Sequence, residues 1–394
     1  MKQYVVLLDA FFLALLITSC SSNLPLDSQA DSGISPYRVS LTTAKDVALA
    51  FMNERTPLSV TKSTSNSILS TSTFKGQQGQ DLAFIVTFST GGYVLVSADN
   101  RLDPILGYSE TGVLPEDKAQ LPVGFQLWLE GLEETLARLD DDSSEPDPAV
   151  ASFWDRLLPT NTKVVPLNPN PPALIDTTVG PLLTSTWHQW DPYNWATPMC
   201  YIDSLHQNIH APAGCAPLAI ARIMHYHQYP NIFYWADIPN SGATANTAAL
   251  FESIYNNLGS EISFGANATT VSSSFNPATF LSVNYGYTYA QRCNYSSTAY
   301  LTMKDELLTY QRPVILSGRP TSGDGHYWVC DGVHYYQTCT ELDDGSFVTY
   351  GHLYFHHAWG YDSSLDAWLS SSAQFTVDGT TFSQSLKLCY HLYP

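Results

Sequence analysis

The chain has 394 residues, enough to bury a sizeable core, and this length suggests two structural units. It carries 17 Lys and Arg against 36 Asp and Glu residues, and the formal net charge of −19 argues against a surface for nucleic acid or another polyanion. A peptide, or another neutral or basic partner, is compatible with this charge.

Residues 1–20 have the layout of a secretory signal, with Lys2 near the start, an apolar run, and small residues before Cys20. The apolar run is too short for a membrane span. Because ITSC, residues 17–20, resembles a bacterial lipobox, we expect lipid attachment at Cys20. An ordinary signal peptide is the alternative. Either outcome predicts a protein that is secreted or held at the cell surface or outer membrane of a bacterium, with membrane contact only through that anchor.

A small α+β unit is expected after a polar, flexible tether at 21–35. Its predicted elements are an amphipathic helix at 41–56, two strands joined by a Gly-Gly turn at 82–100, and a helix at 123–142. The second helix has its apolar residues at helical spacing, which indicates one buried face: Phe125, Trp128, Leu129, Leu132, Leu136 and Leu139.

A linker and a second domain follow. The stretch PLNPNPPALIDTT, residues 166–178, has prolines that block both a helix and a central strand, so 151–178 is interpreted as a linker. From about Val179 to Pro394 the composition is rich in Trp, Tyr, His and Asn, with short strands after a helix near residue 215. This segment is the predicted second domain.

The cysteines and short motifs indicate neither a metal site nor a bound cofactor. With Cys20 and Cys215 set aside, five of the seven cysteines remain, and an odd number argues against a complete disulfide framework. The sequence has no CxxC or HExxH motif for zinc and no GxGxxG or GxxxxGK loop for a nucleotide. We therefore predict no cofactor.

The chemistry is expected at Cys215, in AGCAPLAIARIMHYHQYP, residues 213–230. A thiol attacks as the thiolate, and the amides and dipole at a helix N-terminus stabilise that anion. Gly214 permits a close approach, and Ala216 and Pro217 suit a first helical turn. A cysteine in such a place is more often a small core residue, so this stretch alone does not establish a nucleophile.

A cysteine nucleophile needs an imidazole partner, which can be distant in sequence. Of the eleven histidines, His326 has the most suitable context, because glycines precede it and an apolar strand-like run follows it in SGDGHYWVCDGV. Seven others are interpreted as surface or satisfied core residues, with the alternative that His356 and His357 line a pocket: His206, His210, His225, His227, His352, His356 and His357.

Several stretches in this order resemble the streptopain family of bacterial cysteine peptidases. They are GGYVLVSADNRLDPILGYSETG, WHQWDPYN, GCAPLAIARIMHYHQYP, RPVILSG followed by GHYWVCDGV, and YFHHAWGYDSSLDAWL. The resemblance implies an α+β fold: a papain-like catalytic domain at 179–394, preceded by a small α+β inhibitory propeptide domain at 36–150 and an activation linker at 151–178.

The resemblance also implies the roles of four residues. Cys215 would be the nucleophile, His326 the general base, Gln189 the side-chain donor of the oxyanion hole, and Trp359 the first tryptophan of an Asn-Trp-Gly-Trp pattern. The chain departs from that pattern at Ala358, in place of Asn, and at Tyr361, in place of the second Trp. The helix after the cysteine also differs at Pro217 and Arg222.

The resulting prediction is a secreted or surface-anchored cysteine endopeptidase made as a zymogen, acting through a Cys-His dyad and an acyl-enzyme. Its partners would be protein or peptide substrates and its own propeptide, with no nucleic acid and no metal. One alternative is a surface protein that keeps the fold, has lost catalysis and binds peptide. Another is a cysteine transferase or amidase, because the dyad does not specify the acyl acceptor.

Overall fold

The computed structural model describes residues 35–55, 66–141, 144–158, 172–202, 206–296, 298–320, 324–342, 344–371, 376–377, 380–381 and 386–394. The predicted signal with Cys20, and residues 21–34 of the predicted tether, lie outside the described residues. The elements belong to one unit, Tyr37–Pro394. No helix in these ranges combines the length and the apolar character needed to cross a bilayer.

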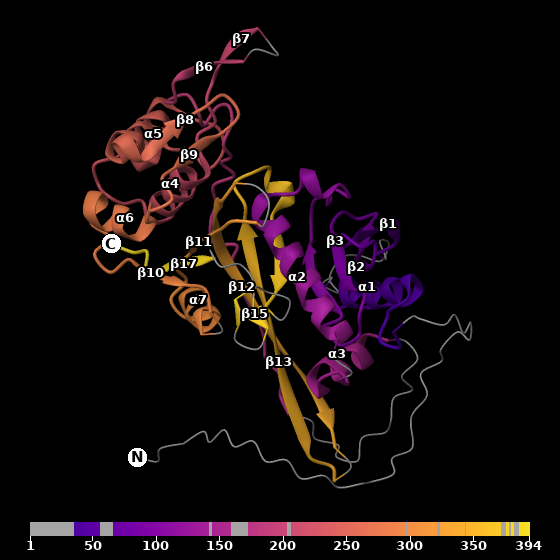
Figure 1. Ribbon diagram of the computed structural model, residues 1–394. Helices are drawn as coiled ribbons and strands as arrows, with labels where there is room; N and C mark the ends of the chain where they lie inside the picture. The colour runs from indigo at the N-terminus through magenta and orange to yellow at the C-terminus, as the bar shows by residue number, and fades with distance from the viewer. Residues whose placement is uncertain are drawn as a thin grey trace, which may run out of the picture. The chain divides into compact units, whose positions relative to one another are not determined.

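The N-terminal part of this unit contains the expected helices and strands (Figure 1). Its elements are α1 (Leu41–Arg55), β1 (Ile68–Lys75), β2 (Asp81–Phe88), β3 (Tyr93–Ser97), β4 (Ile105–Ser109), η1 (Lys118–Gln120), α2 (Val123–Asp141) and α3 (Pro148–Leu157). The turn between β2 and β3 has φ of 94° at Gly91 and 79° at Gly92, a backbone conformation that glycine adopts without strain. The Gly-Gly turn between two strands is therefore confirmed.

The predicted linker at 151–178 differs from the structure at both of its ends. Helix α3 runs into it because Asp147 accepts a hydrogen bond from the amide of Ala149, Pro148 suits the first turn, and Phe153 and Trp154 are buried. At the other end β5 (Asp176–Val179) pairs with β12. Residues 159–171, with the first prolines of the cluster, lie outside the described residues.

The C-terminal part combines helices with long antiparallel strands. Its elements are β6 (Met199–Ile202), β7 (Gln207–His210), α4 (Cys215–His227), η2 (Trp235–Asp237), α5 (Ala245–Leu258), η3 (Gly259–Glu261), β8 (Ile262–Phe264), β9 (Thr269–Val271), α6 (Pro277–Tyr285), β10 (Gln291–Asn294), α7 (Ala299–Leu308), β11 (Val314–Gly318), β12 (His326–Glu341), β13 (Phe347–Ala358), η4 (Ser363–Leu365), β14 (Ala367–Ser370), β15 (Thr376–Val377), β16 (Thr380–Thr381) and β17 (Lys387–Tyr390). Helices α5, α6 and α7 were not predicted from the sequence.

One sheet runs through both parts, in the order β1-β2-β3-β4-β14-β13-β12-β11-β17-β10, with β5 also on β12. The two parts join where β4 pairs with β14, Trp368 opposite Tyr108 and Leu369 opposite Gly107. Side chains from both parts also share one core, in which Phe125 of α2 packs with Trp328 and Trp359. The N-terminal part is therefore built onto the strands that carry the candidate site.

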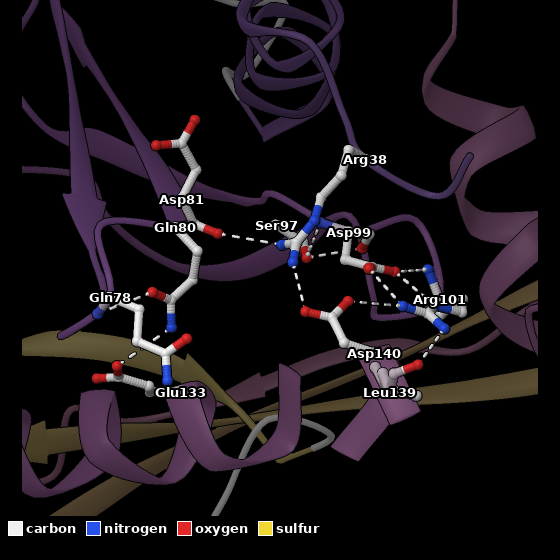
Figure 2. Close-up of polar contacts among 10 residues, drawn as sticks. All are labelled: Arg38, Gln78, Gln80, Asp81, Ser97, Asp99, Arg101, Glu133, Leu139 and Asp140. Atoms are coloured by element: carbon white, nitrogen blue, oxygen red, sulfur yellow. Dashed lines mark hydrogen bonds and ion pairs between the residues drawn. The ribbon is translucent and has the colours of Figure 1, made fainter. Parts of the chain in front are cut away.

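The C-terminal end of α2 is fixed by a buried polar cluster (Figure 2). Arg101 binds both carboxylate oxygens of Asp99, at 2.9 and 2.8 Å, and its guanidinium also donates to the carbonyl of Leu139. Arg38 donates to Asp140 at 2.7 Å. Arg38 and Arg101 are two cations at the C-terminus of α2 and complement its dipole. This network holds that end of α2 to the segments around the β-strands, and the first turn of α2 lies at the other end, toward the candidate site.

Candidate active site

Cys215 is the first residue of α4, where the sequence predicted it. Gly214 before it has φ of 90°, and a Cβ there would lie 3.0 Å from Thr269, so both the backbone and the space require glycine. Burial raises the pKa of the Cys215 thiol, while backbone groups of Tyr327, Ala216 and Cys215 itself act to lower it. Burial outweighs the helix terminus in this form of the protein, so the thiol is protonated at neutral pH.

His326 begins β12, at the end of the strand that pairs with β11. Its Nε2 donates to the carbonyl of Trp359 at 2.8 Å. The ring stacks on Trp328 at a centroid distance of 6.1 Å and contacts Tyr361 at 5.3 Å. Burial lowers the pKa of His326 to about 4, so the ring is neutral. Because a carbonyl only accepts, the proton sits on Nε2 and Nδ1 is the basic nitrogen.

The structure brings the segments of all four predicted site residues together. The backbone carbonyl of Gln189 accepts from the amide of Ala213 at 2.6 Å, two residues before Cys215. Trp190, next to Gln189, contacts Tyr361 at 5.7 Å. Burial, and then Cys215 when its thiol is ionised, raise the pKa of the Tyr361 hydroxyl, so Tyr361 lies near that thiol. Among the described residues no hydrogen bond joins the Cys215 thiol to the His326 ring.

Trp359 contacts His326 through its main chain. Its carbonyl makes the contact, whereas its fully buried indole stacks on His357 at 4.8 Å and contacts Trp328 at 5.5 Å. Within the described ranges no ring contact links Trp359 to His326. The aromatic contacts of the imidazole come instead from Trp328 and Tyr361. The sequence named Tyr361 only as a departure from a pattern, and it gave no signal for Trp328.

The first turn of α2 lies against this aromatic group. A Cβ added at Gly124 would stand 2.4 Å from Cζ3 of Trp359 and 3.2 Å from Cδ2 of Trp328. Phe125 contacts the Trp359 ring at 6.0 Å, and the backbone of Val123 acts to lower the pKa of Tyr361. Only glycine lets the helix backbone approach Trp359 so closely.

A second contact between the two parts surrounds His334 of β12. Its Nδ1 lies 3.0 Å from the hydroxyl of Tyr108 and 3.2 Å from Nη1 of Arg55, both in the N-terminal part, and its Nε2 lies 3.0 Å from Asp176. Burial and then Arg55 lower the pKa of His334 to about 4. The contact between the two parts therefore requires that the imidazole of His334 be neutral.

In the part of the chain that the structure describes, no group of three His, Cys, Asp or Glu side chains is arranged to hold a metal ion. The six cysteines described, Cys200, Cys215, Cys293, Cys330, Cys339 and Cys389, are free thiols.

Two family models match the two parts of the chain separately. Residues 36–136 match the Spi protease inhibitor model, and residues 187–235 and 231–369 match the Peptidase C10 family model. The thiol protease/hemagglutinin PrtT of Porphyromonas gingivalis is 25% identical in an alignment 371 residues long, which covers 84% of this chain and 39% of that protein. Streptopain of Streptococcus pyogenes is 27% identical over 198 residues, 48% of this chain and 43% of streptopain.

The chain thus spans about two fifths of the length of these curated relatives. A solved fragment of prointerpain A from Prevotella intermedia superposes with a TM-score of 0.55 and 18% identity, over 84% of this chain and 99% of the fragment. This likeness confirms the predicted fold class, a papain-like α+β domain preceded by a small α+β propeptide domain.

Proposed function

Since residues 187–369 belong to the Peptidase C10 family, the streptopain family of cysteine peptidases, and residues 36–136 to a family of protease inhibitors, we propose that this chain is the zymogen of a cysteine endopeptidase. The catalytic domain would be residues 179–394 and the inhibitory propeptide residues 36–150, and the cut on activation would fall within 151–178, between α3 and β5. Protein or peptide substrates fit the family and the acidic charge of the chain, and nucleic acid does not.

The observation that carries the proposal is the arrangement of the thiol and the imidazole. Cys215 stands at the N-terminus of α4, and the Nε2 proton of His326 is held by a carbonyl, which leaves Nδ1 as the base. In the reaction, Nδ1 would take the thiol proton and Sγ would attack the peptide carbonyl carbon. The Cys215 amide and the Gln189 side chain would hold the oxyanion.

The remaining steps return the enzyme to its starting state. The Nδ1 proton of His326 passes to the leaving amine as the C–N bond breaks, and the acyl group stays on Sγ of Cys215 as a thioester. A water, deprotonated by the same nitrogen, then attacks the thioester. The carboxylic acid leaves and the thiol is restored, so the overall reaction is hydrolysis of one peptide bond and needs no cofactor.

Inhibition by the propeptide is supported by the contacts of α2. Its first turn packs on Trp359, whose carbonyl holds His326, and approaches Trp328 and Tyr361, whose rings contact the imidazole. Burial raises the pKa of Cys215 and lowers that of His326, so both groups are held in their uncharged forms. Removal of α2 would readmit water, which moves both pKa values back toward the range in which a thiolate-imidazolium pair forms.

A thiol-directed active-site probe tests the proposal. We expect the activated chain to be labelled at Cys215 and to hydrolyse peptide, and the full chain to be labelled much more slowly. Cys215→Ala should abolish both properties with an unchanged melting temperature. Hydrolysis that survives this substitution would remove Cys215 from the mechanism.

A surface protein that binds peptide without cleaving it is the second candidate. The observations that favour it are Ala358, in place of the family's Asn, and the lack of a hydrogen bond between Cys215 and His326 among the described residues. Peptide that binds to the activated chain but is never acylated would support this alternative.

We also propose that the chain leaves the cytoplasm of a bacterium and is anchored by lipid at Cys20. The support is the sequence of residues 1–20, whose apolar run ends in ITSC.

A further inference from the structure

Two hydrogen bonds in series connect Asp366 to His326 through the backbone of one residue. Oδ1 of Asp366 accepts from the amide of Trp359 at 2.9 Å, and the carbonyl of Trp359 accepts from Nε2 of His326 at 2.8 Å. Trp359 is fully buried and its indole is packed on both sides, so its backbone has little freedom to move. The carboxylate thus fixes the amide of the same residue whose carbonyl fixes the imidazole.

The place of Asp366 in the fold explains why its side chain reaches the amide of Trp359. The chain leaves β13 at Ala358, turns through η4, and enters β14 at Ala367, which is paired with His357. Asp366 is the last residue of this turn, and continuing the register places it opposite Ala358, next to Trp359. Asp362, earlier in the same turn, instead accepts from the amide of Ser364 and has no contact with Trp359 among those found in the described residues. The two carboxylates of one turn therefore differ in what they hold.

Charged and titratable groups face Asp366 from four elements: Arg222 of α4, His356 of β13, Asp331 of β12 and Tyr93 of β3. Burial raises the pKa of Asp366 to about 6, against the lowering by Arg222 and His356. The carboxyl is therefore ionised above about pH 6, where a charged acceptor strengthens the bond to the Trp359 amide, and this strength is lost as the pH falls below that value.

We propose that Asp366 is the positioning residue of the general base: through the Trp359 backbone it sets the orientation and tautomer of His326. The inference rests on the proposed function, because His326 must be the base for its orientation to matter. It assigns the orientation of the imidazole to a main-chain carbonyl that Asp366 secures.

The test compares variants of the full chain after activation with a metalloprotease that is then inactivated by chelation. Asp366→Ala should lower kcat about tenfold or more with KM unchanged, since a misplaced base cannot reach its proton. Asp366→Asn keeps an oxygen acceptor without the charge, so its kcat should lie between Asp366→Ala and wild type. In wild type, kcat should fall below about pH 6 as Asp366 is protonated, and Asp366→Asn should not show this fall. Asp362→Ala is the matched control, with wild-type kcat.

The pH dependence of Cys215 alkylation by iodoacetamide is a second measurement. Its midpoint should not change if a variant only alters the stability of the turn between β13 and β14. A displaced imidazole stabilises the thiolate less, so the alkylation midpoint should rise by about one unit or more in Asp366→Ala and stay fixed in Asp362→Ala. Wild-type kcat and midpoint in Asp366→Asn and Asp366→Ala would overturn the inference, as would equal losses in Asp362→Ala. If wild type shows no Cys215-dependent hydrolysis, the proposed function fails, whereas the midpoint still reports whether Asp366 acts on the pair.

Discussion

Gly124→Ala should loosen the propeptide from the active site. The added Cβ would lie 2.4 Å from Cζ3 of Trp359, whereas carbon atoms pack at about 3.5–4.0 Å, so the helix or the ring must move by roughly 1 Å. The Trp359 ring has little room, because it is fully buried against Trp328 and Phe125. Overpacking of this kind costs about 1–3 kcal/mol, and alanine returns at most about 1 kcal/mol through helix propensity.

A mid-range overpacking cost of about 2 kcal/mol less the full alanine gain of about 1 kcal/mol leaves about 1 kcal/mol, which corresponds to an open population of the zymogen that is roughly 5 times larger. The assay is the rate at which a thiol-directed probe labels Cys215 in the full chain, and this rate should rise by the same factor. Glu134→Ala, on the exposed face of the same helix, should leave the rate unchanged. Once the propeptide is removed, Gly124→Ala and wild type should have the same kcat. A wild-type labelling rate in the folded Gly124→Ala chain would refute the close-approach argument.

Four further results are expected. When the N-terminal part is docked, His334 is neutral beside Arg55, so docking should be at full strength above about pH 6.5 and weaken as the pH falls toward 4. The rate of Cys215 labelling in the full chain should therefore rise as the pH falls through that window. His334→Gln should make this rate less dependent on pH. Trp359→Ala retains the carbonyl but loses the buried ring, which should lower the free energy of unfolding by about 3–5 kcal/mol in denaturant titrations and reduce single-turnover acylation in the folded fraction. Ala358→Asn should not raise kcat, because Nε2 of His326 already has an acceptor and a buried unpaired amide costs about 1–3 kcal/mol. Cys20→Ser should move the protein from the membrane to the soluble fraction in cell fractionation, and an unchanged distribution would exclude the anchor.

Elements with a strong local signal were predictable from the sequence. The apolar spacing of 123–142 identified α2, since a period near four residues needs no knowledge of the partner surface. Gly214 marked the start of α4, because a φ of 90° is a requirement of that one position. Helices α5 to α7 were missed, and so was α3, whose capping by Asp147 stands in a stretch that reads as irregular. The pairing of β4 with β14 joins residues about 260 positions apart, which no local pattern encodes.

The candidate site was predicted in its residue types more fully than in its contacts. Cys215 and His326 follow from chemistry that allows few substitutes, and motif order brought them together. The contact of His326 with Trp359 is made by the main chain, so the identity of the side chain says little about it. Asp366 gave no signal because an aspartate in a turn is ordinary, and its partner is settled only when β13 and β14 pair.

The short pairing of β4 with β14 has a consequence for the protein that activation leaves behind. If the proposed activation removes residues 36–150, β14 becomes an edge strand, and the amide and carbonyl groups of Trp368 and Leu369 that faced β4 lose their partners. The stack of Tyr108 on the Trp368 ring is lost as well, which uncovers apolar surface beside the open edge. An unpaired apolar edge is a template for any extended chain, including a second copy of the same enzyme. In the full chain these two residue pairs shield the edge, so the N-terminal part would protect β14 from such pairing until the proposed activation removes it.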